Sequence, residues 1–196
     1  QSVSKYFNDL TITAPVIIYN GAAIYDIIDG EFKHCEYLSA SAKDLLTDVL
    51  SKFPELSAEI LTKEKIYALQ KNEIEEYHIK ITNTQPIECS IDEVDNDNWI
   101  KILLAMETEK IGNLISYIEK NNYNDLSFVQ SCSFFYEVLP KGISKGKALK
   151  ELRKLCNFDD YTIVAVGDYY NDIEMLKYAD IGIAMGTGTD VAIESS

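Results

Sequence analysis

One stretch late in the chain contains the residue types that hold a hard cation and a phosphate. The apolar, β-branched run 161–166 is followed by Gly167 and Asp168, so the carboxylate of Asp168 would stand at the end of a strand. In open α/β sheets, ligands bind just outside the carboxyl ends of the strands. Asn171 has the residue type of a helix cap, and Glu174 follows it at the spacing of a capping box. This pattern predicts a carboxylate beside a helix start, which suits a cation with oxygen ligands and a neighbouring phosphate.

Other polar residues follow predicted strands or begin predicted helices. The segment Ser144-Lys145-Gly146-Lys147 opens a helix ahead of the strand at 161–166, and Asn20-Gly21 ends an apolar run at 16–19. A lysine at a helix start can contact a phosphate that also meets free backbone N–H groups. Each residue alone also has an ordinary interpretation: a solvated lysine, a turn asparagine, or, for Asp172, a charge that stabilises a helix start.

The elements around these residues alternate. A helix from Ser144, the strand 161–166, a helix after Asn171 and a strand at 181–185 predict parallel strands joined by helical crossovers. A nearly continuous apolar run is typical of a strand that is buried on both faces of such a sheet, and we expect this of 161–166.

The rest of the chain predicts a different module between two parts of this core. We assign 1–38 to the first part of the core, 39–138 to an α+β module, and 139–196 to the second part. Asp29-Gly30 between β-rich runs predicts a hairpin in the first part. In the module the pattern leaves 77–82 open between strand and helix. The other expected elements are helices at 41–53, 62–70 and 108–120, and strands at 56–61, 99–106, 126–130 and 134–139. A short helix is expected at 1–10.

Composition narrows the class of protein. The net charge of −14 and the pI near 4.5 argue against binding to nucleic acid or to an anionic membrane. No apolar run approaches the ~18 residues of a membrane span. The four cysteines form no Cys-x-x-Cys pair, so we expect reduced thiols and a cytoplasmic protein. His34 and His78 have no partner pattern, and we interpret both as structural or surface residues. We expect both ends of the chain to be cuts through a longer protein.

Taken together, these motifs resemble the haloacid dehalogenase superfamily. The residues that carry the resemblance are Ser144 to Leu149, Gly167-Asp168 to Leu176, and Ala179 to Gly186, with 16–22 and its hairpin also similar. The chain looks most like the Cof-type phosphatases, which carry a large α+β cap inserted in a Rossmann-like α/β core. The resemblance covers nearly the whole chain, and the cap matches in pattern more than in residues.

The resemblance implies a magnesium-dependent hydrolysis of a small phosphorylated metabolite, such as a sugar phosphate, through an aspartyl-phosphate. Lys145 would steady the nucleophile and the phosphate, and Asp168 would be a Mg²⁺ ligand. Asn171 would contact the phosphate, Asp172 would orient Lys145 or the waters of the metal, and Asn20 would help to bind the substrate. Phosphoryl transfer depends mostly on positioning and charge neutralisation, which a cation and a lysine supply.

The chain departs from the family in its first motifs. The nucleophile motif Asp-x-Asp-Gly-Thr is absent, so we expect these 196 residues alone to be inactive. Asp95-Asn-Asp97 resembles it in letters only, since no apolar strand leads into it. Two alternatives therefore stand beside the phosphatase: a binding or regulatory remnant of the same fold, and the phosphorylation domain of a P-type cation pump. Residues 182–194 look like a pump segment, but the pump phosphorylation site and a membrane span are lacking.

Overall fold

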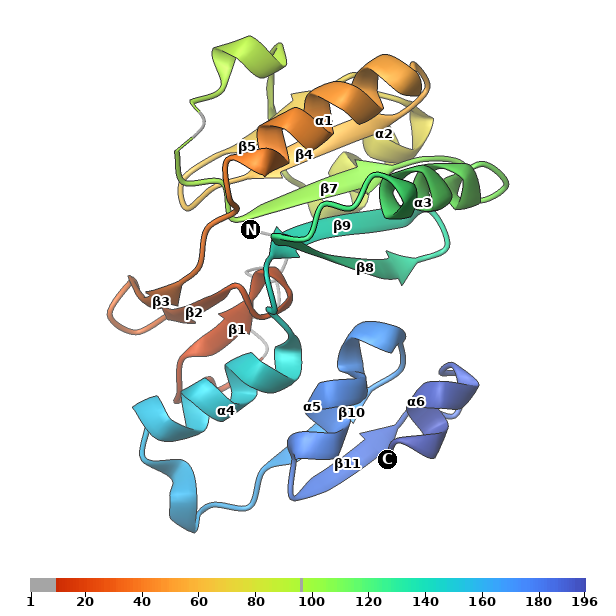
Figure 1. Cartoon of the computed structure of the whole chain (residues 1–196). Coiled ribbons are helices and arrows are strands. Elements are labelled where there is room, and N and C mark those ends of the chain that lie inside the picture. Colours follow the sequence, from red (N-terminus) through yellow and green to blue (C-terminus); the bar gives the residue numbers. More distant parts are fainter. Residues whose placement is uncertain (1–9, 96) are drawn as a thin grey trace. The chain divides into compact units, whose positions relative to one another are not determined.

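The structure is a computed structural model that describes residues 10–95 and 97–196. Its elements divide into two compact units (Figure 1). The first contains residues 37–128 and 132–141, and the second contains 13–36, 129–131 and 142–196. The helix expected at 1–10 lies almost wholly outside the described residues. In the described part, no helix combines the length and the apolar character needed to cross a bilayer.

The first unit is a six-stranded sheet with three helices. The strand order is β6-β5-β4-β7-β9-β8, in which β5 and β6 are parallel while β4–β5, β4–β7 and β7–β9 are antiparallel. The strands are β4 (Ser57–Leu61), β5 (Ile66–Leu69), β6 (Ile87–Glu88), β7 (Lys101–Ala105), β8 (Leu126–Cys132) and β9 (Phe135–Pro140). The helices are α1 (Ser41–Lys52), α2 (Glu73–Thr82) and α3 (Ile111–Lys120), with a 3₁₀ turn η3 (Ile91–Glu93).

The two faces of this sheet are buried differently. One face packs with α1 and α3 into an apolar core, to which β4, β7 and β9 contribute alternate residues. Those residues are Ala58, Ile60, Ile102, Leu104, Tyr136 and Val138. The residues between them on the same strands, such as Glu59 and Glu137, point to the opposite face and are also buried. That second face is therefore a buried surface with charged side chains.

The second unit carries two small sheets. β1 (Val16–Ile18), β2 (Ala23–Asp26) and β3 (Glu31–Cys35) form an antiparallel sheet, and a short turn η2 (Tyr19–Gly21) follows β1. β10 (Val164–Gly167) and β11 (Ile181–Ala184) are parallel. The other elements are α4 (Lys145–Leu155), η4 (Phe158–Asp160), η5 (Tyr170–Asp172), α5 (Ile173–Tyr178) and α6 (Asp190–Glu194). The fold is thus α/β, with a parallel β10-α5-β11 unit and a hairpin at Asp29-Gly30, as the pattern predicts.

Three sequence expectations are wrong. Residues 62–70 form a turn and strand β5 instead of a helix, because Thr62 and Lys65 close the turn that joins β4 to β5: the Thr62 N–H donates to the Lys65 carbonyl at 3.0 Å. The run 161–166 is not buried on both faces. Ala165 is buried, whereas Val164 and Val166 are 54% and 53% exposed, because among the described strands β10 pairs only with β11. The third is the helix cap expected at Asn171, because this residue lies inside the turn η5.

The segment left open at 77–82 belongs to α2. Asn72 begins this helix by accepting a hydrogen bond from the Glu75 N–H at 2.9 Å, and Asn83 ends it in a left-handed conformation with φ 54°. The apolar residues at 77, 79 and 81 alternate as in a strand, but the capping asparagines on both sides decide for the helix.

Candidate active site

The carboxyl end of β10 turns sharply at Gly167. A Cβ atom on Gly167 would lie 2.5 Å from Cβ of Asp172, so only glycine leaves room for the chain to fold back here. The Asp168 carbonyl accepts a hydrogen bond from the Thr189 N–H at 2.9 Å, which fixes the turn to the segment after β11. The Asp168 side chain is exposed, so its carboxylate is available to a ligand.

Asp172 connects the strand end to the helix start of α4. Its Oδ1 accepts a hydrogen bond from Lys145 Nζ at 2.6 Å, and its Oδ2 accepts from the N–H groups of Asp168 and Tyr169 at 3.0 and 3.2 Å. The side chain is buried, which would raise the pKa of its carboxyl, but the hydrogen bonds from Lys145 and the two N–H groups lower this pKa below its ordinary value. Asp172 is therefore an ionised, fully engaged carboxylate that holds Lys145 beside the Asp168 turn.

Lys145 is the first residue of α4. Ser144 caps the helix by accepting a hydrogen bond from the Lys147 N–H at 3.1 Å, and its hydroxyl also donates to Glu174 of α5. The first N–H groups of a helix have no partner within the helix, and the helix dipole favours an anion there. An ammonium group at this position adds a full positive charge.

Asn20 belongs to the same group of residues through its side chain and through its neighbour Gly21. Asn171 Nδ2 donates to Asn20 Oδ1 at 3.1 Å. Gly21 has φ +103°, and a Cβ atom there would lie 2.3 Å from the Ser144 carbonyl oxygen. This close backbone approach, which only glycine allows, holds the end of η2 against the start of α4.

The structure places Asn171 differently from the sequence expectation. The turn η5 starts at Tyr170, so Asn171 lies inside it and is not the cap of α5. The N–H of Tyr169 is satisfied by Asp172, and Glu174, the expected capping-box partner, accepts from Ser144 instead. The Asn171 amide is thereby turned toward Asn20. The sequence pattern predicted that Asn171 and Glu174 would cap the helix. Instead, Asp172 caps the turn by accepting hydrogen bonds from the N–H groups of Asp168 and Tyr169.

All five residues that the sequence singled out lie in the second unit. Hydrogen bonds join Lys145 and the backbone of Asp168 to Asp172, and separately Asn171 to Asn20, with Asn171 and Asp172 adjacent in the chain. Sequence reasoning found Ser144 as a helix cap but missed its bond to Glu174, and it missed how Gly21 and Thr189 help to position the site. An Asn-Gly pair at a strand end was the available signal for Gly21. Asp95, the start of the look-alike motif, is exposed and lies in the first unit, and its carbonyl accepts from Trp99 Nε1 at 2.6 Å.

A magnesium ion fits this donor set. Mg²⁺ takes oxygen ligands, keeps several waters, and is commonly held by one or two carboxylates together with substrate phosphate. Asp168 offers an exposed carboxylate, while both oxygens of Asp172 already accept hydrogen bonds. Asp168 would therefore be the direct ligand, with water and phosphate at further positions.

Comparison with known proteins identifies the family. A family model described as haloacid dehalogenase-like hydrolase matches residues 1–196. The chain belongs to this family. A Bacillus subtilis protein named "Putative phosphatase" is 27% identical over 206 residues, covering 99% of this chain and 74% of its own length.

Solved structures of other haloacid dehalogenase-like hydrolases share the fold. One from Bacteroides thetaiotaomicron has a TM-score of 0.83 at 20% identity and covers 100% of this chain and 75% of its own. A sugar phosphatase of HAD subclass IIB has a TM-score of 0.82 at 19% identity, covering 99% of this chain and 72% of its own. At such identities these likenesses show the fold, which is that of a haloacid dehalogenase core with a cap.

Proposed function

We propose that this chain is part of a magnesium-dependent phosphatase that hydrolyses a small phosphorylated metabolite, such as a sugar phosphate. The observation that carries the proposal is the Asp172 carboxylate, which holds the Lys145 ammonium at 2.6 Å and the backbone of Asp168 at 3.0 Å. An amine and an exposed carboxylate are thus fixed beside one turn. The phosphatase name of the Bacillus subtilis relative and the sugar phosphatase among the fold neighbours support the same reaction class.

Each residue has a role that its contacts support. Lys145 binds the phosphoryl oxygens and neutralises charge that spreads over them in the transition state, and Asp172 positions Lys145. Asn171 and Asn20 donate hydrogen bonds to the substrate. Asp168 binds Mg²⁺, which when bound offsets the negative charge of the phosphoryl group. None of these residues is the nucleophile, and the family's reaction uses an aspartate that becomes phosphorylated. Residues 39–138 form the cap that selects the leaving group.

We propose that the protein is cytoplasmic. The four cysteines, Cys35, Cys89, Cys132 and Cys156, form no disulfide with one another, as suits a reducing compartment. The net charge of −14 disfavours nucleic acid and anionic membranes as partners, and it makes the single ammonium at Lys145 important for attracting a phosphate.

The test measures phosphate release from an aryl phosphate ester by the full-length protein, with Mg²⁺ and after chelation. Asp168→Asn removes the metal ligand and should lower Mg²⁺-dependent turnover by about 100-fold or more. Asp160→Asn is the matched control, because it removes an exposed carboxylate in η4 outside the site, and its turnover should equal the wild type. Circular dichroism checks that both variants fold. Unchanged turnover in Asp168→Asn would overturn the assignment, and an inert wild-type protein would favour the binding remnant.

A further inference from the structure

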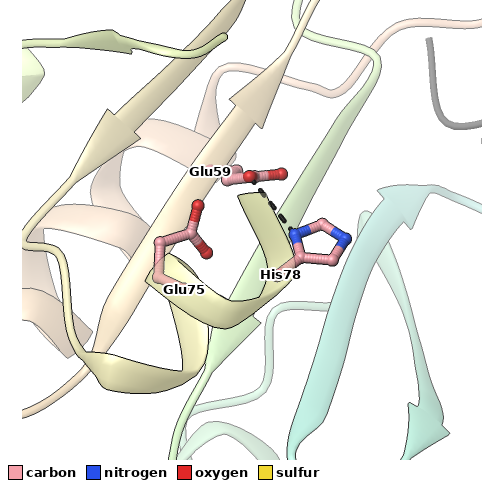
Figure 2. A group of neighbouring side chains, drawn as sticks. All are labelled: Glu59, Glu75 and His78. Atoms are coloured by element: carbon pink, nitrogen blue, oxygen red, sulfur yellow. Dashed lines mark ion pairs between the residues drawn. The ribbon is translucent and has the colours of Figure 1, made fainter. Parts of the chain in front are cut away.

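The buried second face of the six-stranded sheet contains a cluster of three ligand-type side chains. Glu59 on β4, with Glu75 and His78 on α2, bring their ligand atoms within 4.8 Å of one another (Figure 2). Glu59 and Glu75 are 1% and 0% exposed, and the His78 side chain is 18% exposed. This cluster lies in the first unit and shares no residue with the site around Asp168.

Four polar atoms of this cluster are buried without a hydrogen-bond partner. Both carboxylate oxygens of Glu75, Oε1 of Glu59 and Nδ1 of His78 are buried without a hydrogen-bond partner. His78 Nδ1 lies 3.4 Å from Glu59 Oε1, close enough for an ion pair only if the ring is protonated. A buried carboxylate without a donor costs several kcal/mol, so something positive must occupy the space between these groups.

The surrounding charges do not neutralise the cluster. Lys101 of β7 is 2.8 Å from Glu137 of β9, and Lys71, whose charge also acts on Glu75, is 2.5 Å from Glu88 of β6. With all three carboxyls ionised, Glu59, Glu75 and Glu137 outnumber the charge of Lys101, so the cluster needs a proton or a cation for balance. A divalent cation would balance this charge.

Hydrogen bonds fix the start of α2, and a ring contact positions His78. Asn72 accepts a hydrogen bond from the Glu75 N–H at 2.9 Å, and its amide donates to the carbonyls of Glu55 and Ala105 at 3.0 and 2.9 Å. These bonds fix the start of α2 to the ends of neighbouring segments. The His78 ring contacts the Phe135 ring edge-on, with centroids 5.0 Å apart. The helix that carries Glu75 and His78 is therefore held in place by contacts outside the cluster, as a metal site needs.

The ligand types and their spacing favour a transition-metal cation over Mg²⁺ or Ca²⁺. Glu75-x-x-His78 is an i, i+3 pair on one helix face, the spacing with which helices supply a carboxylate and an imidazole to one metal. Imidazole nitrogen suits Zn²⁺ and its neighbours in the first transition row, whereas Mg²⁺ and Ca²⁺ prefer oxygen alone. We propose that Glu59, Glu75 and His78 form a structural binding site for a divalent transition-metal cation, with Zn²⁺ as the probe. No such ion is present in the structure.

A proton is the competing occupant of the cluster. Burial and the neighbouring Glu59 carboxylate raise the pKa of Glu75 to about 9, so a proton between the two carboxyls is the alternative to a metal. A metal would displace that proton. The two occupants therefore predict different results in a titration with metal.

The experiment titrates Zn²⁺ into the chelator-treated protein by calorimetry and follows the melting temperature. We expect one Zn²⁺ per chain at this site and a higher melting temperature. His78→Ala and Glu75→Gln should each lower the affinity by more than about tenfold and remove the thermal shift. Glu75→Gln should fold well without metal, because its amide can donate to Glu59.

Matched controls separate this site from others. His34→Ala removes the other histidine, which lies in the second unit, and Glu76→Gln removes the exposed neighbour of Glu75 on α2; both should bind Zn²⁺ like the wild type. The Asp168→Asn variant should also keep this Zn²⁺, so loss of phosphatase activity and loss of the metal are distinguishable. Absence of Zn²⁺ binding in the wild type, or equal binding and equal thermal shift in His78→Ala and Glu75→Gln, would overturn the proposal.

Discussion

The two units of the chain bury their apolar residues to different extents. In the first, twenty buried hydrophobic residues form one cluster, among them Trp99 and Leu104, which are 1% and 0% exposed. In the second, the buried cluster around β10 consists of Ala165, Leu176 and Ala192. Yet the second unit holds the residues for phosphate chemistry, and it positions them by backbone hydrogen bonds and by glycines at points of close approach. Stability and site geometry thus have different physical origins in the two units.

The strands of the two units also differ in how exposed their apolar side chains are. On β10 and β11, Val164, Val166, Ile181 and Ile183 are between 45% and 54% exposed, whereas Ile60, Ile102 and Leu104 of the first unit are 0% exposed. Strands of similar composition therefore have very different surroundings in the two units. Truncating a side chain in each unit measures this difference.

The largest effect is expected from Leu104→Ala in the core of the first unit. Removing a fully buried leucine side chain costs roughly 2–5 kcal/mol, because transfer energy is lost and a cavity remains. Trp99, the only tryptophan of the chain, is buried in the same core, so its fluorescence during denaturation reports the unfolding of this unit. Val166→Ala in the second unit is the control and should leave that transition within about 0.5 kcal/mol. Equal shifts for the two variants would contradict the comparison.

A smaller effect of a different kind is expected from Gly21→Ala. The new Cβ atom would meet the Ser144 carbonyl at 2.3 Å, and φ +103° is unfavourable for alanine, so the second unit should lose about 1–3 kcal/mol. Hydrogen exchange of the amides of β1 and α4 measures the loss. Gly186→Ala is the matched control, since it has no atom within 4 Å of the added Cβ and no positive φ. Unchanged protection in Gly21→Ala would show that the close approach relaxes at little cost.

These differences explain what the sequence could predict. Apolar periodicity predicted α1, β4, β7 and α3, because burial in one large core imposes it, and strand ends followed by glycine and aspartate predicted the Asp168 site. The same reasoning failed at Val164 and Val166, whose apolar character does not reveal which faces are covered. It failed at Thr62 because a threonine suits a turn as well as a helix cap. The contact of Asp172 with Lys145, 27 residues away, is long-range geometry that no local pattern encodes, and only the family resemblance suggested it.

The smallest effect is expected from Asp172→Asn. Its folded-state pKa is lowered, so the ionised form stabilises the second unit above the ordinary carboxyl pKa near 3.8, and this contribution disappears as the pH falls through the folded-state value. At neutral pH the substitution should cost about 1–2 kcal/mol, since Lys145 loses a charged partner but remains 28% exposed and partly solvated. Hydrogen exchange of β10 and α4, measured against pH, should show the wild type and the variant converging below pH ~3.8. Asp160→Asn is the control, because it removes an exposed carboxylate of η4 outside the site, and its protection at neutral pH should equal that of the wild type. A gap between Asp172→Asn and the wild type that stays constant into acid would mean that something other than the ion pair with Lys145 sets the role of this residue.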